Sequence, residues 1–384
     1  MAHLQTPWVT ERLGIRPSDP LREFIVLKPG GALLGGVDAI AYLMRRIWWA
    51  WPLWLAAKTP LIHHALWAGY RWIAARRHCL TGSCAVRFRP PRHTVHHPAL
   101  DWIPLLVFTG LAFLLTRALP AWALMWNLAF ALYAGSKWLT WKRVLRRHVF
   151  PGVIRSLGYL LFWVGMDPAP FFNARRSPIA VARVDWLRTS ANTAFGAFLI
   201  WRVAAPAFER DPLAGAWVGM IGTIMTLHFG LFRLLALGWR KAGIEAQPIM
   251  RAPVLAASLS EFWGERWNRA FNDLVSEPIF RPCHRRFGAV WATMIVFLVS
   301  GLVHDLIISI PARGGYGLPT LYFLIQGLGV LLTRSRTAKR MRLHRGLIGW
   351  LLTAFVTAAP LPLLFHTPFR ETVILPFLQT LNAL

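Results

Sequence analysis

The feature that most constrains this chain is a series of long apolar runs separated by short basic loops. A helix needs about 20 consecutive apolar residues to cross the hydrocarbon core of a bilayer. The longer runs lie near residues 102–118, 120–138, 193–208, 213–235, 287–310, 317–333 and 346–366, and shorter ones at 153–172 and 373–384. We therefore expect an all-α, polytopic integral membrane protein with about eight to nine transmembrane helices.

The domain organisation follows from the same runs. No polar stretch is long enough to build a separate soluble core, so we expect one integral membrane domain over residues 31–384. Residues 1–30 are polar and contain proline, which predicts a cytosolic tail or surface segment rather than a secretory signal. The stretch WWAWPLW (48–54) is rich in tryptophan, which prefers the membrane–water interface. We therefore expect residues 32–75 to form interfacial or short re-entrant helices.

The charge of the chain is strongly positive, with a formal net charge of +27. Nucleic-acid binding is one interpretation of such a chain. However, the basic residues lie in loops that alternate with nearly neutral turns, as the positive-inside rule requires of cytosolic loops. We therefore expect membrane lipids and no nucleic acid as partners, and an anionic cytosolic cosubstrate is a further alternative. The high arginine content is typical of GC-rich genomes and favours a bacterial inner membrane over the endoplasmic reticulum.

The apolar piece at 153–172 has basic flanks on both sides, so both of its ends should be cytosolic. Asp167, Pro168 and Pro170 would break a helix there, which predicts a re-entrant hairpin. Irregular backbone at membrane depth is tolerated where it is buried in protein or lines a cavity. The sequence thus predicts re-entrant or interfacial helices around an intramembrane reaction chamber.

The cysteines predict neither a disulfide framework nor a metal centre. Cys79 and Cys84 lie near a histidine-rich loop, but their spacing is wider than that of most zinc sites. We expect no metal ion and no resident cofactor.

The stretch SLSEFWGERWNRAFND (258–273) combines three kinds of side chain. Ser258 and Glu261 form a capping-box pattern, which predicts the start of a helix over 258–274. Such a helix would have an acidic and amide face, an aromatic face and a basic face: Glu261, Glu265, Asn268 and Asn272; Trp263 and Trp267; Arg266 and Arg269. It should lie against or inside the protein on the cytosolic side, and an interfacial helix without chemistry is the alternative.

A second polar anomaly lies in FLVSGLVHDLII (297–308), where His304 and Asp305 stand side by side within an apolar run. An aspartate at the centre of a span costs roughly 2.5–3.5 kcal/mol on insertion scales, so such a pair indicates function. Histidine is well suited to be a general base near neutral pH. The alternative is a structural histidine, hydrogen-bonded to Asp305 or Ser300.

Together, SLSEFWGERWN (258–268) and VSGLVHD (299–305) resemble the membrane-bound O-acyltransferases, and most nearly their wax-synthase-like branch. The resemblance covers about residues 225–335. The two signature residues of that family map onto Asn268 and His304, whereas Asp305 stands where many relatives have glutamate.

The resemblance implies transfer of an acyl group from acyl-CoA, as cosubstrate, to the hydroxyl of a lipid or small-molecule alcohol. His304 would be the general base, and Asn268 would position the thioester or stabilise the oxyanion. Supporting or substrate-binding roles are expected for a further set: Trp263, Glu265, Arg266, Trp267, Asn272, Ser300 and Asp305.

Two alternatives stay open at this stage. One is acetyl transfer to a sugar or secondary metabolite. The other is a proton-coupled transporter that uses His304 and Asp305 as a relay, although transporters usually contain internal repeats and EFWGERWN has no counterpart in the first half of the chain.

Overall fold

The computed structural model describes residues 25–27, 33–45, 98–146, 151–173 and 180–384, together with residues 54, 59, 66 and 67. The contacts divide the chain into two units, Met1–Arg87 and Phe88–Leu384. Most of the expected tail, most of the expected interfacial segment at 32–75 and the pair Cys79 and Cys84 lie outside the described residues. The single membrane domain over 31–384 stays a prediction.

The first unit contains a small hairpin that the helical pattern did not predict. Strand β1 (Ile25–Leu27) pairs antiparallel with β2 (Leu33–Gly35), and helix α2 (Gly36–Met44) follows directly. Apart from this hairpin, the described elements are helical, as expected.

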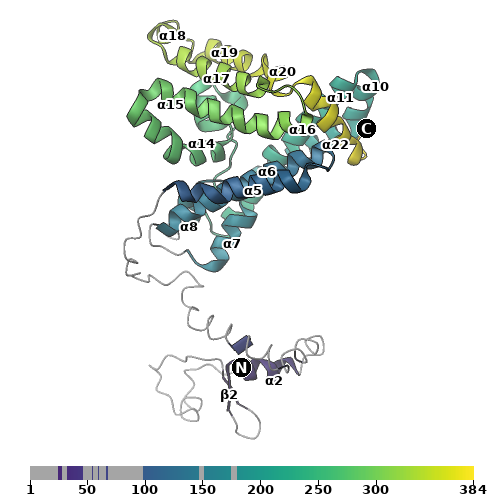
Figure 1. The fold of residues 1–384 in the computed structure, drawn as a ribbon, viewed down its shortest axis with the longest axis vertical. Coiled ribbons are helices and arrows are strands. Elements are labelled where there is room, and N and C mark those ends of the chain that lie inside the picture. The colour runs from purple at the N-terminus through teal and green to yellow at the C-terminus, as the bar shows by residue number, and fades with distance from the viewer. Residues whose placement is uncertain are drawn as a thin grey trace. The chain divides into compact units, whose positions relative to one another are not determined.

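The second unit is built from α-helices (Figure 1). Several of them continue directly into short π-helical turns. Its α-helices are α5 (Ile103–Thr116), α6 (Ala121–Arg146), α7 (Val153–Phe162), α8 (Pro168–Phe172), α9 (Arg183–Phe198), α10 (Ala204–Arg210), α11 (Pro212–Ile224), α12 (Phe232–Lys241), α13 (Leu259–Glu261), α14 (Arg269–Val275), α15 (Arg281–His304), α16 (Ile310–Ala312), α17 (Leu318–Arg334), α18 (Arg336–Arg340), α19 (Gly346–Ala358), α20 (Leu361–Leu364), α21 (Thr367–Phe369) and α22 (Leu375–Thr380). The π-helical turns are η3 (Leu199–Val203), η4 (Met225–Leu231), η6 (Phe262–Arg266), η7 (Ser276–Phe280), η8 (Asp305–Ser309) and η9 (Arg370–Ile374), and 3-10 turns form η2 (Pro98–Trp102) and η5 (Pro253–Leu255).

Three continuous helical stretches of the described chain are long and apolar enough to cross a bilayer: Pro212–Lys241, Arg269–Ala312 and Gly346–Leu364. Shorter apolar helices cover Leu100–Thr116, Val153–Phe162 and Leu318–Arg334. These stretches coincide with runs identified in the sequence, whereas the full count of eight to nine spans stays a prediction.

Helices α15 and α17 lie side by side in the second unit (Figure 1). Each begins with a proline in its first turn, where the missing N–H is not needed. The two helices approach closely at Gly301, where an added Cβ would lie 2.6 Å from the Cα of Thr320. A larger residue at 301 would therefore push α17 away from α15.

The predicted break in 153–172 is confirmed, because α7 ends at Phe162 and α8 begins at Pro168. Side chains from two other helices bind the carbonyl groups that this break leaves without helical partners. The Trp239 Nε1–H donates to Phe162 O at 2.9 Å, and the Tyr133 hydroxyl donates to Trp163 O at 2.7 Å. Irregular backbone is thus satisfied inside the protein. Its re-entrant position in a membrane stays a prediction.

Lys137 completes this arrangement. Its side chain is 1% exposed, its Nζ donates to Gly165 O at 2.7 Å, and the same atom lies 3.2 Å from the ring centroid of Tyr159. We expect Lys137→Met to lower the free energy of unfolding by about 1–3 kcal/mol, because Gly165 O would lose its donor in a buried place. Thermal unfolding in detergent measures this, with Lys241→Met, at an exposed lysine, as the control. Equal unfolding temperatures for the two variants would contradict the assignment.

Candidate active site

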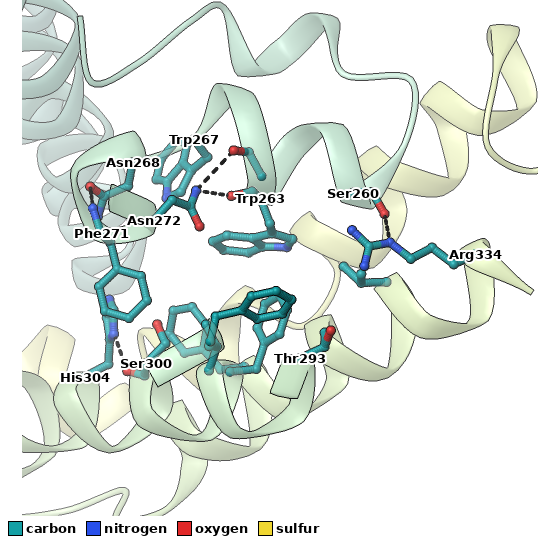
Figure 2. A pocket seen from close by; sticks show the side chains of 16 residues that line it. Ser260, Trp263, Trp267, Asn268, Phe271, Asn272, Thr293, Ser300, His304 and Arg334 are labelled. Atoms are coloured by element: carbon teal, nitrogen blue, oxygen red, sulfur yellow. Dashed lines mark hydrogen bonds between the residues drawn. The ribbon is translucent and has the colours of Figure 1, made fainter. Parts of the chain in front are cut away.

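A cavity of about 180 Å³ lies between the segment 260–280 and the helices α15 and α17 (Figure 2). Polar and aromatic side chains share its wall. The lining residues are Ser260, Trp263, Gly264, Trp267, Asn268, Phe271, Asn272, Phe280, Thr293, Val296, Phe297, Ser300, His304, Phe323, Val330 and Arg334. His304 and Asn268 lie toward one end, and Ser260 and Arg334 lie toward the other (Figure 2).

The segment that contains Asn268 begins as predicted and then departs from the prediction. Ser258 is the N-cap, and its Oγ accepts from the Glu261 N–H at 3.1 Å. The expectation of one continuous helix over 258–274 is wrong. After α13 and η6 the backbone is extended at Trp267 and left-handed at Asn268 (φ 41°), and α14 then starts at Arg269. The predicted single acidic and amide face is therefore broken between Glu265 and Asn268.

The left-handed residue Asn268 is held by hydrogen bonds on both sides. Its backbone N–H donates to Met250 Sδ at 3.2 Å, and its Oδ1 accepts from the Phe271 N–H at 3.3 Å as the N-cap of α14. Asparagine tolerates this conformation better than most residues. Because the Phe271 N–H requires an oxygen as acceptor, the orientation of the Asn268 side-chain amide is fixed. Its Nδ2 makes no hydrogen bond to any other described residue and is free to donate in the cavity.

His304 is oriented by its own helix. Its Nδ1 lies 2.7 Å from Ser300 O, one turn earlier, and its ring centroid is 4.4 Å from that of Phe323. A carbonyl oxygen only accepts, so Nδ1 carries the hydrogen in the neutral ring and Nε2 keeps a free lone pair. Within the described chain, Nε2 has no hydrogen-bond partner. The hydrogen bond to Ser300 is one of the two structural contacts expected for this histidine from the sequence.

Asp305 does not point toward His304. Its Oδ1 accepts from Ser309 Oγ and from the Gly317 N–H, each at 2.8 Å, and its Oδ2 accepts from the N–H (3.1 Å) and the hydroxyl of Thr320. Gly317 and Thr320 stand at the N-terminus of α17, where N–H groups lack helical partners and negative charge is favoured. Asp305 therefore caps α17 from the neighbouring helix. The π-helical turn η8 begins at this residue.

Asn272 lines the cavity but has a structural contact. Its Nδ2 donates to Trp263 O in a short hydrogen bond, which ties α14 to η6.

Three expected supporting residues lie away from the cavity lining. Glu265 is exposed, and the Arg266 Nε donates to Glu261 Oε1 at 2.6 Å while its Nη1 donates to Arg251 O at 3.0 Å. Burial alone would raise the pKa of Glu261, but the Ala257 N–H and Arg266 outweigh it, so this pKa lies below its ordinary value. Asp305 is the third such residue.

Several lining residues were missed in the sequence. Arg334 ends α17, and its Nε donates to Ser260 Oγ at 2.8 Å. Phe323 packs against His304. Arg334 looked like one of many positive-inside charges in the sequence, and Phe323 like an ordinary apolar residue. Only the pairing of α17 with α15 and with the segment 258–275 reveals that both reach the cavity.

The arrangement suits proton transfer next to a developing negative charge. One end of the cavity offers a neutral imidazole nitrogen as acceptor and an amide N–H as donor. A base and an oxyanion donor at one place can act on an acyl group. Among the described residues, no group of three or more His, Cys, Asp or Glu side chains could hold a metal ion.

Comparison with known proteins agrees with this chemistry. Residues 246–325 match the model of the membrane bound O-acyl transferase family. A probable long-chain-alcohol O-fatty-acyltransferase of Arabidopsis thaliana is 34% identical over 107 residues, which cover 25% of this chain and 31% of the relative. The long-chain-alcohol O-fatty-acyltransferase of Simmondsia chinensis is 28% identical over 126 residues, which cover 30% of this chain and 36% of the relative. An acyl-CoA–sterol O-acyltransferase of Arabidopsis thaliana is 32% identical over 71 residues, 17% of this chain and 21% of the relative. The chain thus matches less than half the length of each of these relatives.

The contacts of Asp305 predict a specific loss of stability. Asparagine offers one oxygen to the four donors that the carboxylate accepts, so Asp305→Asn should lower the free energy of unfolding by about 2 kcal/mol. The matched control is Asp211→Asn, because Asp211 is the exposed N-cap of α11 and asparagine caps equally well. Thermal unfolding of the two variants measures the difference. If both unfold at the wild-type temperature, Asp305 does not clamp α15 to α17.

Proposed function

We propose that this multi-pass membrane protein is an acyl-CoA-dependent O-acyltransferase of the membrane bound O-acyl transferase family, whose model matches residues 246–325. It moves an acyl group from acyl-CoA to the hydroxyl of an alcohol, as in wax-ester synthesis. The observation that carries the proposal is the cavity that His304 and Asn268 both line, with no hydrogen-bond partner for His304 Nε2 or Asn268 Nδ2 among the described residues.

In the proposed reaction, the alcohol oxygen attacks the thioester carbonyl carbon while His304 Nε2 takes the hydroxyl proton. The carbonyl oxygen becomes an oxyanion, and the Asn268 Nδ2–H group donates to it. The intermediate then collapses, the C–S bond breaks, and the CoA sulfur receives the proton from His304. The products are an ester and free CoA, and the imidazole returns to its neutral form.

The opposite end of the cavity fits the donor's anionic part. Among the described residues, only Nε of Arg334 has a hydrogen-bond partner, Ser260, so its Nη groups are available to a ligand. From Phe323, which contacts the His304 ring, to Arg334 the helix α17 rises about 16 Å. This is comparable to the pantetheine arm of CoA. The phosphates would therefore lie at Arg334 when the thioester lies at His304.

For the acceptor, a long-chain alcohol is favoured. Two of the relatives act, by their names, on long-chain alcohols. Six aromatic side chains also line the cavity: Trp263, Trp267, Phe271, Phe280, Phe297 and Phe323. In the complete protein, about eight to nine transmembrane helices would enclose this chamber in a bacterial inner membrane.

The proposal is tested with purified protein, labelled acyl-CoA and a panel of alcohols. Release of CoA thiol together with formation of the labelled ester would support it. The transporter alternative would be favoured instead if no acyl donor is consumed while a pH gradient drives uptake of a solute.

Replacing His304 by asparagine tests the roles of its two nitrogen atoms separately. The asparagine Nδ2 can still donate to Ser300 O, but nothing replaces Nε2. We expect kcat to fall by about a hundredfold or more with little change in unfolding temperature. His284→Asn, at an exposed histidine near the start of α15, is the control and should keep wild-type turnover. Full activity of His304→Asn would remove its role as the base.

Replacing Asn268 by aspartate keeps the side-chain oxygen that caps α14 and removes the amide N–H donor. The carboxylate still accepts from the Phe271 N–H, but the Nδ2 hydrogens are lost. We expect kcat to fall by about 10²- to 10³-fold while the unfolding temperature stays close to that of the wild type. Asn382→Asp, at an exposed asparagine whose backbone is also left-handed (φ 51°), is the control and should keep wild-type turnover. Wild-type turnover by Asn268→Asp would show that the amide does not stabilise the oxyanion.

A further inference from the structure

Trp263 is fixed at both its side chain and its backbone. The indole Nε1–H donates to Gln326 Oε1 at 3.2 Å, and Trp263 O accepts from Asn272 Nδ2. The ring also packs against Phe297 and Phe323, with centroid separations of 5.9 and 5.6 Å. A tryptophan held in this way keeps one orientation.

Gln326 determines the orientation of the Trp263 indole, because its own amide is held in one orientation. Its side chain is 0% exposed within α17, and its Nε2 donates to Val356 O in α19 at 2.7 Å. Because Val356 O needs an N–H donor, the amide cannot turn around, and Oε1 must face the indole. A buried amide in an apolar helix is costly unless it is hydrogen-bonded, and here one group binds α19 while the other binds the cavity wall.

The position of Trp263 in the cavity means that its hydrogen bond to Gln326 affects the path of a ligand. The residue lies between the end of the cavity with His304 and Asn268 and the end with Ser260 and Arg334 (Figure 2). An elongated donor that reaches from Arg334 to His304 must pass the indole. Water that enters at Arg334 takes the same route to the thioester.

We propose that Gln326 is a positioning residue that holds Trp263 across this passage, so that the bound donor fills it and water stays away from the thioester. The inference rests on the proposed function. Loss of the contact lets the indole rotate and opens the passage. Water then competes with the alcohol, and thioester hydrolysis accompanies acyl transfer.

The test compares CoA thiol release with ester formation in Gln326→Met, Trp263→Phe and the double variant. Wild-type protein should release only slightly more thiol than ester, so that a small share of the thiol is unmatched by ester. In each single variant we expect the unmatched share of thiol to rise about tenfold, the order expected for one lost buried hydrogen bond. The double variant should resemble the single ones, because both changes remove the same contact. The controls are Trp291→Phe and Gln379→Met, at exposed residues, which should stay coupled.

A ratio of products does not depend on the fraction of folded protein, so a general loss of structure would not move it. Trp263→Phe also keeps Gln326 and its bond to Val356, and it tests the idea if Gln326→Met does not fold. An unchanged ratio in Trp263→Phe, or effects that multiply in the double variant, would overturn the inference. Wild-type protein that releases no thiol from any acyl-CoA would contradict the proposed function itself.

Discussion

The carboxylate of Asp305 joins the two helices that carry the site. Four donors from Ser309, Gly317 and Thr320 surround it, three of them at the N-terminus of α17. In an apolar span such a charge is tolerated because it is fully hydrogen-bonded and lies at the positive end of a helix dipole. Since Asp305 faces α17, the preceding residue His304 is turned along the helix toward the cavity. The carboxylate of Asp305 therefore joins α15 to α17, and the imidazole of His304 lines the cavity.

Three polar residues that line the cavity each use one atom for a structural hydrogen bond and leave another atom without a partner among the described residues. In His304 one nitrogen binds Ser300 and the other is free, and in Asn268 the oxygen caps α14 while the amide hydrogens are free. Arg334 binds Ser260 through Nε, and its Nη groups have no hydrogen-bond partner among the described residues. Each side chain is thus oriented by one atom and offers another to a ligand. Such preorganised groups need little rearrangement during the reaction, which is the physical basis for the proposed catalysis.

Local patterns predicted much of this arrangement. The apolar runs, the N-cap at Ser258 and the break before Pro168 follow from residue preferences over a few positions, and the structure has all three. The place of His304 and Asn268 in one cavity followed from the two motifs together. Other features depend on contacts between distant segments. The left-handed turn at Asn268 is held by Met250, and the role of Gln326 requires α19 beside α17, so no local pattern predicts them.

The most direct test of the account is a structure of the protein with a non-hydrolysable acyl-CoA analogue bound in the cavity. The account predicts that the analogue runs from Arg334 past Trp263. Its acyl oxygen should lie within hydrogen-bond distance of Asn268 Nδ2, and its reacting carbon should lie close to His304 Nε2. An analogue bound elsewhere, or a His304 side chain that faces lipid while the analogue is bound, would contradict the account.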